Sequence, residues 1–199
     1  MTDFEEVTVT LQNSGDVQVH SWAGSDSAQP LVIVAPDSSP RDWDEFITYL
    51  SQSHSPVLPR VTSHLELLML IWEIGEPVLL LAQGPKAVAI ASETVATAAG
   101  SINSLIICDG ELGDRQLAGM HDISTLILRG RQNDVLSHES AVRMHDSLRH
   151  STLIEPENCG NFPAKDNPDA AAAAVNWFIA GPGSESAGFD EAEPIDPKA

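Results

Sequence analysis

Residues 78–89 read Val-Leu-Leu-Leu-Ala-Gln-Gly-Pro-Lys-Ala-Val-Ala. The first four positions form an unbroken apolar run, which is typical of a strand covered on both faces of a sheet. Pro85 suits the first turn of a helix, because that position needs no backbone N–H donor, and we expect this helix to continue to Ala98. A buried strand, a tight turn at Gly84 and a helix are the unit from which a parallel sheet is built.

The same unit recurs along the chain from residue 31 onward. Apolar runs alternate with segments of helical periodicity: the runs are 31–34, 55–58, 78–81, 105–108, 126–128 and 152–154, and the helical segments are 41–52, 64–73, 85–98, 137–149 and 169–179. Before them, residues 7–11 and 17–22 alternate apolar and polar side chains around a turn, which predicts a β-hairpin. We therefore expect an α/β protein with a doubly wound, mainly parallel sheet and an N-terminal antiparallel hairpin.

The composition restricts the class of partner. The 199 residues include 29 Asp and Glu against 10 Lys and Arg, a formal charge of -19 that repels phosphate, so we expect neither a nucleic-acid nor a membrane partner. No apolar run reaches the roughly 18 residues of a membrane span, and the N-terminal segment is acidic, so we expect a cytoplasmic protein. We expect one domain over residues 1–180 and a disordered acidic tail over residues 181–199.

Four stretches, in this order, resemble the α/β-hydrolase superfamily across about residues 5–180. Residues 32–43 resemble the family's oxyanion strand and first helix, and residues 80–89 resemble its nucleophile elbow. Residues 126–134 resemble the acid-bearing loop, and residues 159–178 resemble the histidine loop with the final helix. It implies an α/β-hydrolase-like fold. Residues 110–122, where relatives carry a cap, are too few for one, so the resemblance implies a capless domain.

The resemblance also implies which positions would carry the chemistry, and two of the three cannot. The nucleophile position holds Gly84, which has no side chain that could attack a carbonyl carbon. The histidine position holds Asn161, whose amide cannot accept and return a proton near neutral pH. The acid position keeps Asp134, which could instead cap the following helix or hold its loop. Pro36 lies in the oxyanion loop and has no N–H to donate.

Other polar residues follow the predicted strands, at the edge where open parallel sheets bind ligands. The candidate ligand-binding residues are Pro36, Asp37, Gln83, Lys86, Asp109 and Asp134. Lys86 could bind an anion together with the free N–H groups of a helix, or simply be exposed. We expect Cys108 to be a buried, inert thiol and Cys159 to be somewhat more exposed. His138 is a surface histidine or faces the site, and no residue spacing predicts a metal or another cofactor.

Three functions remain open. The first is a catalytically degenerate protein that binds an unknown small molecule or a protein. The second is an atypical hydrolase of small esters or lactones, using Asp134 with a bound water, or Cys108. The third is a structural or interaction subunit that uses the apolar helix around residues 65–72 and the acidic tail. That helix is apolar on nearly all faces, so it belongs either to the core or to an interface, with a homodimer among the alternatives.

Overall fold

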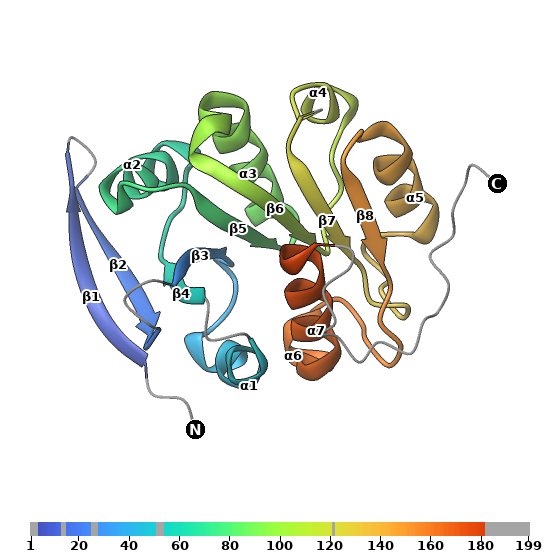
Figure 1. Ribbon diagram of the computed structural model, residues 1–199, viewed down its shortest axis with the longest axis horizontal. Coiled ribbons are helices and arrows are strands. Elements are labelled where there is room, and N and C mark those ends of the chain that lie inside the picture. Colours follow the sequence, from blue (N-terminus) through green and yellow to red (C-terminus); the bar gives the residue numbers. More distant parts are fainter. Residues whose placement is uncertain (1–3, 13–14, 25–27, 51–53, 121, 182–199) are drawn as a thin grey trace.

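The structure, a computed structural model, describes residues 4–12, 15–24, 28–50, 54–120 and 122–181. Within these residues eight strands form one sheet, in the order β1-β2-β4-β3-β5-β6-β7-β8 (Figure 1). The strands are β1 (Phe4–Leu11), β2 (Gly15–Trp22), β3 (Gln29–Val34), β4 (His54–Pro59), β5 (Val78–Gln83), β6 (Ile102–Cys108), β7 (Ser124–Leu128) and β8 (Ser151–Ile154). β2 pairs antiparallel with β1 and β4, and the other pairs are parallel, which confirms the predicted fold class.

Helices cover both faces of the sheet (Figure 1). They are η1 (Pro40–Trp43), α1 (Asp44–Tyr49), α2 (His64–Ile74), α3 (Pro85–Ala98), η2 (Ala99–Ser101), α4 (Asp114–Ala118), α5 (His138–Ser147), α6 (Pro163–Asp166) and α7 (Pro168–Ala180). Side chains alternate along each strand, so Val32 enters a core covered by α2, α3, α4 and α5, while Leu31 and Ile33 enter a second core covered by α1, α6 and α7. The unbroken apolar runs of the sequence follow from this double coverage.

Two helices differ from the prediction. The segment predicted as one helix over residues 41–52 is the 3-10 turn η1 followed by α1, which ends at Tyr49 because Leu50 is extended, with φ -65 and ψ 146. The short helix α6 was not predicted, since four residues are too few to show a helical period. It is held by the carboxylate of Asp166, whose Oδ2 accepts hydrogen bonds from the N–H groups of Gly160 and Phe162 at 2.9 and 3.2 Å.

The connection between β6 and β7 is as short as the sequence predicts. It contains α4, a helix of five residues, and no further helix or strand among its described residues. Among the described parts of the chain, no helix has both the length and the apolar character needed to cross a membrane. The predicted acidic tail lies outside the described residues except for Gly181, so the proposed boundary of the domain stays a prediction.

Candidate functional site

The predicted site residues lie at one edge of the sheet. Because β3, β5, β6, β7 and β8 run parallel, their carboxyl ends meet there. The turns after these strands carry, in chain order, Pro36 and Asp37, Gln83, Gly84 and Lys86, Asp109, Asp134, and Asn161. β5 lies between β3 and β6, so Gly84 stands near the middle of this edge.

Gly84 makes the turn between β5 and α3. Its backbone has φ +87 and ψ 164, a conformation that residues with a side chain rarely adopt. The Gly84 N–H donates to the carbonyl oxygen of Cys108 at 2.8 Å, and its own carbonyl accepts from the N–H of Val88 at 3.0 Å. A Cβ built on Gly84 would meet no atom within 4 Å. The requirement for glycine therefore comes from the backbone and not from crowding.

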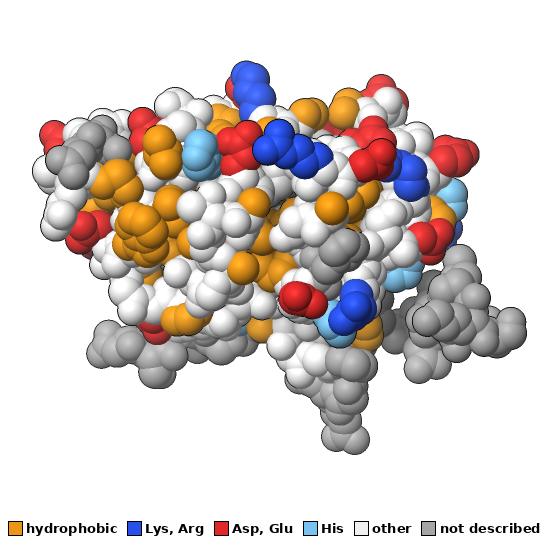
Figure 2. Space-filling model, turned by 90° about the horizontal axis from the view of Figure 1, so that it is seen from above, with side chains coloured by type: hydrophobic (Ala, Val, Ile, Leu, Met, Phe, Trp, Pro, Cys, Tyr) orange, Lys and Arg blue, Asp and Glu red, His pale blue; other side chains and the backbone are white. Residues whose placement is uncertain are grey.

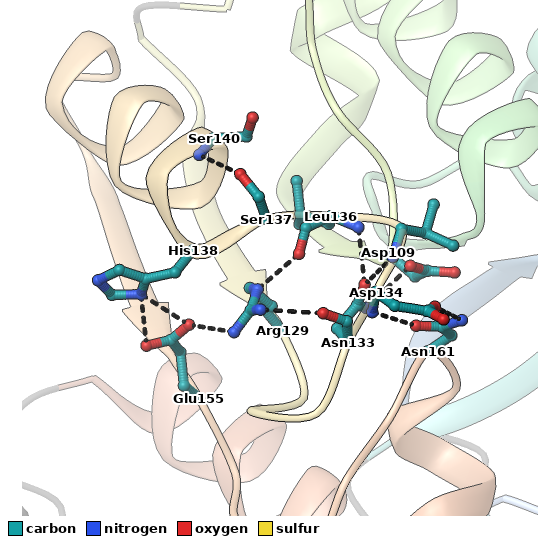
Figure 3. A network of polar contacts seen from close by, with 11 residues as sticks. Asp109, Arg129, Asn133, Asp134, Leu136, Ser137, His138, Ser140, Glu155 and Asn161 are labelled. Carbon is teal, nitrogen blue, oxygen red and sulfur yellow. Dashed lines mark hydrogen bonds and ion pairs between the residues drawn. The ribbon is translucent and has the colours of Figure 1, made fainter.

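Asp134 and Asn161 are in direct contact, through two hydrogen bonds (Figure 3). Nδ2 of Asn161 donates to Oδ1 of Asp134 at 2.6 Å, and the N–H of Asp134 donates to Oδ1 of Asn161 at 3.0 Å. Ser137 caps α5 by accepting from the N–H of Ser140, so the expectation that Asp134 might cap this helix is wrong and the loop contact is its observed role. Asn161 holds the acid in place without supplying a group that transfers protons at neutral pH.

Gln83 connects the turn at Gly84 to the loop that carries Asn161. Its Nε2 donates to the backbone carbonyl of Asn161 at 2.9 Å. Its Oε1 is buried and has no hydrogen-bond partner among the described residues. The turns after β5, β7 and β8 are thus joined into one polar network through Asn161.

Asp109, directly after β6, is the buried carboxyl group of this edge. It is 6% exposed, and its backbone lies in the left-handed region with φ +54. Oδ1 of Asp109 accepts a hydrogen bond from Nδ2 of Asn133 at 2.8 Å. Burial raises the pKa of Asp109 to about 6; the hydrogen bond from Asn133 opposes this shift, and the charges of Asp134 and Asp166 add to it. Asp109 can therefore exchange a proton near neutral pH.

Arg129 shapes the loop that carries Asp134 (Figure 3). Its buried guanidinium donates to the carbonyl oxygens of Leu136 and Asn133, at 2.6 and 3.1 Å, and to Oε1 of Glu155 at 2.7 Å. Glu155 also contacts Nδ1 of His138 at 3.0 Å, so this exposed histidine is engaged with a carboxylate. Arg129 is not among the predicted site residues, although an arginine at the end of an apolar run is a usable signal, because a buried arginine must be paired.

Gly130 allows the loops after β7 and β8 to touch. A Cβ at Gly130 would lie 2.2 Å from the carbonyl oxygen of Gly160 and 2.3 Å from that of Cys159. The backbone N–H of Gln132 donates to the same Cys159 carbonyl at 2.9 Å. Backbone thus packs on backbone here, and only glycine fits.

The two thiols are both buried and free. This confirms the prediction for Cys108, whose pKa burial raises far above its ordinary value, next to smaller effects of Cys159 and Asp109. The prediction of a more exposed Cys159 is wrong, because its side chain is 0% exposed in a loop whose backbone packs against Gly130. Burial, with a contribution from Asp166, raises the pKa of Cys159 to about 11. Thiolates are the reactive form of cysteine, so neither residue has the properties of a nucleophile.

The β3 turn supplies no free charge to the site. Pro36 is half-buried, and the neighbouring carbonyl of Ala35 accepts from the N–H and the hydroxyl of Ser38 at 3.1 and 3.0 Å. Nζ of Lys86 lies 2.9 Å from Oδ1 of Asp37, with both side chains mostly exposed. The charge of Lys86 is therefore already matched by a carboxylate. Among the described residues, no group of three or more His, Cys, Asp and Glu side chains is arranged to hold a metal ion.

Comparison with known proteins gives similarity at the level of structure. No protein-family model matches the sequence, and no curated protein matches it. A predicted CIB-like hydrolase from Thermoplasma acidophilum has a TM-score of 0.76 at 10% identity, with 90% of this chain and 99% of that chain covered. A haloalkane dehalogenase from Bradyrhizobium elkani has 0.74 at 12% identity, covering 90% and 98%. A thermophilic esterase from Thermogutta terrifontis has 0.73 at 10% identity, covering 88% and 98%. Identities this low show a shared fold.

Proposed function

We propose that this chain, which has the α/β-hydrolase fold, binds a small ligand at the carboxyl edge of its sheet without hydrolysing it. One observation carries the proposal: Asn161 occupies the position next to Asp134 that a proton-transferring residue needs, and both ends of its amide bond to Asp134. Gly84, at the neighbouring strand end, offers no nucleophile. The fold thus keeps the framework of the site, while the groups that would attack an ester and move its proton are replaced.

The ligand would contact the polar residues of this edge. Asp37, Gln83, Asp109 and Asp134 present mostly hydrogen-bond acceptors, and the amine of Lys86 is paired with Asp37. This set favours a neutral ligand that donates hydrogen bonds over an anion. Pro36 would border the site without donating to the ligand.

Hydrolysis of p-nitrophenyl acetate and butyrate tests the proposal. The unaltered protein should hydrolyse neither ester faster than buffer does. The double variant Gly84→Ser/Asn161→His should gain activity, because a hydroxyl at Gly84 meets no steric obstacle and a histidine at Asn161 would lie beside Asp134. Each single variant is the matched control and should stay inactive, since nucleophile and base act as one unit. Turnover by the unaltered protein that Asp134→Ala or Asp109→Asn abolishes would contradict the proposal.

Binding itself can be followed by NMR with γ-butyrolactone and 1,4-butanediol as probes. These two four-carbon compounds differ in their hydrogen-bond donors, which only the diol has. The diol should shift the backbone amides of Gln83, Gly84, Asp109 and Asp134 more strongly than the lactone does. Shifts spread evenly over the surface, or confined to another region, would place binding elsewhere.

The second candidate, an atypical ester or lactone hydrolase, has one observation in its favour. Asp109 has a pKa raised to about 6 by burial, which is the range in which a general base operates. An enzyme of this kind would show a rate that rises with pH through about 6 and is lost in Asp109→Asn. The variant of this hypothesis that uses Cys108 has no such support, because that thiol is buried and its pKa is strongly raised.

A further inference from the structure

The helix α2 leaves large apolar side chains in contact with solvent. Leu67, Leu70 and Ile71 are buried in the core, but Trp72 is 60% exposed and Leu65 is 55% exposed. Leu65 and Trp72 are seven residues apart and therefore lie on one side of the helix, two turns from each other. An exposed tryptophan and leucine on one helical stripe form a surface of the kind that proteins bury in an interface.

The neighbouring strand extends this surface. α2 lies against β1 on one face of the sheet. Val9 and Leu11 pack with the core beneath α2, so the exposed Val7, two residues before Val9, lies on the same face. Figure 2 looks down on this face and shows hydrophobic side chains gathered at the end where the hairpin and α2 lie. We call Val7, Leu65 and Trp72 the α2 surface.

The charged side chains of β1 and α2 are acidic, apart from His64. Glu5, Glu73 and Glu76 are exposed beside it. Residues 1–40 and 61–85 contain no Lys or Arg, so β1, β2 and α2 carry none. His64, at the start of α2, also faces an acid, since its Nδ1 lies 2.8 Å from Oε2 of Glu93. The α2 surface is thus an apolar stripe within an acidic border.

We propose that the α2 surface docks an amphipathic helical segment of another protein, whose apolar face is bordered by Lys and Arg. The apolar stripe would bury the apolar face of that segment, and the acidic border would pair with its basic flanks. A second copy of this chain fits less well, because each copy carries a formal charge of -19 and would present the same acidic border. This inference does not depend on ligand binding at Gly84 and Asn161, since it uses different residues.

Fluorescence anisotropy with labelled synthetic peptides tests the docking surface. The probe is an amphipathic peptide of about 14 residues, with Leu on one helical face and Lys on the other. One control peptide has the same composition with the Leu positions scrambled, and the other has Glu in place of Lys. The Leu/Lys peptide should bind the full chain, while both controls bind at least about tenfold more weakly. If the scrambled peptide bound equally well, charge alone would account for the binding, and the proposal would be overturned.

Substitutions then locate the binding. Leu65→Gln/Trp72→Gln should weaken the Leu/Lys peptide at least about tenfold, whereas Val135→Gln, which alters an equally exposed apolar residue near the other end of the sheet, should not. Glu73→Lys/Glu76→Lys should weaken it about threefold to tenfold and reduce its dependence on salt. All of these side chains are exposed, so the unfolding midpoint should stay unchanged. Absence of binding, equal binding to the double Gln variant, or a dimer in light scattering that this variant dissolves would each overturn the proposal.

Discussion

Two neighbouring strands, β5 and β6, end in turns where one residue has a positive φ. The residue at this position is a glycine in one turn and an aspartate in the other. After β5, Gly84 adopts φ +87 with no side chain. After β6, Asp109 adopts φ +54 and keeps a buried carboxyl group. Asp and Asn tolerate the left-handed region better than most residues, but they still lose stability there relative to glycine.

The difference between the two turns indicates that a side chain is kept at positive φ only where it makes hydrogen bonds that offset the backbone strain. At Gly84 a side chain would meet no neighbour within 4 Å, and none is present. At Asp109 the carboxylate bonds to Asn133, and Oδ1 of Asn133 in turn accepts from the N–H groups of Val135 and Leu136 at 2.9 and 2.7 Å. Asp109 therefore supports the loop that presents Asp134, and this contribution offsets the strain of its backbone.

Asp109→Ala should have the largest effect on stability. The substitution leaves Nδ2 of the buried Asn133 without its acceptor, and it places alanine, which tolerates the left-handed region less well than Asp, at φ +54. Together these changes should lower the unfolding free energy by about 2 to 3 kcal/mol. Urea denaturation at pH 5 measures this loss. Asp109→Asn is the matched control, because its amide oxygen can still accept from Asn133 and asparagine tolerates the left-handed region. A loss below about 0.5 kcal/mol in Asp109→Ala would show that Asp109 does not support the loop.

Gly84→Ala should cost about 1 to 2 kcal/mol, all of it from backbone strain. Gly100→Ala provides the comparison: a Cβ at Gly100 also meets nothing within 4 Å, but this glycine does not have positive φ. Thermal and urea unfolding of the two variants should differ by that amount. Equal stability of both variants would mean that the turn at Gly84 relaxes to accept a side chain.

The pH dependence of stability should identify the carboxyl group of Asp109. Its pKa is raised from 3.8 to about 6 in the folded state, so the folded state binds the proton more tightly than the unfolded state. The stability that this proton contributes is present at low pH and is lost as the pH rises through about 6. The wild type should therefore lose about 1 kcal/mol relative to Asp109→Asn between pH 5 and pH 8. Parallel pH profiles of the two proteins would exclude a raised pKa at Asp109.

The smallest expected difference in stability is between Asp109→Gly and Asp109→Ala, and it separates backbone strain from the loss of the hydrogen bond. Asp109→Gly loses the same bond to Asn133 as Asp109→Ala but removes the strain of a Cβ at φ +54. It should be more stable than Asp109→Ala by about 0.5 to 1 kcal/mol, because the flexibility of glycine in the unfolded state cancels part of the gain. If the alanine variant is the more stable one, the backbone at this position carries no strain.

The sequence predicts the sheet because double burial leaves a local trace, an unbroken apolar run such as residues 78–81. The hairpin is equally visible, since its alternation and turn are local. The end of α1 at Tyr49 cannot be predicted in this way, because it depends on one extended residue, Leu50. The short α6 cannot be predicted either, because it is held by a hydrogen bond to Asp166. The position of β4 between β2 and β3 depends on pairing across the whole sheet, which no local pattern records.

In the candidate site, too, some features can be predicted from the sequence and others depend on tertiary contacts. The positions of Gly84, Asp134 and Asn161 follow from the resemblance, and the structure brings Asp134 and Asn161 into contact. The bond between Asp109 and Asn133 joins residues 24 positions apart, so spacing alone gives no sign of it. Cys159 is buried although it lies in a loop, and its backbone packs on Gly130 from the loop after another strand; the composition around the cysteine reveals neither fact.

The pairing of α1 with α7 has a consequence for the synthesis of the chain. α1 is made well before α7, yet they pack on the same face of the sheet and are joined by a hydrogen bond from Nδ2 of Asn176 to the carbonyl of Tyr49 at 3.1 Å. Until the ribosome has released residues 168–180, the core that contains Leu31, Leu79 and Ile106 lacks the cover that α7 provides. A nascent chain therefore carries part of this core unprotected until α7 emerges, and this face is where a chaperone would first find apolar surface.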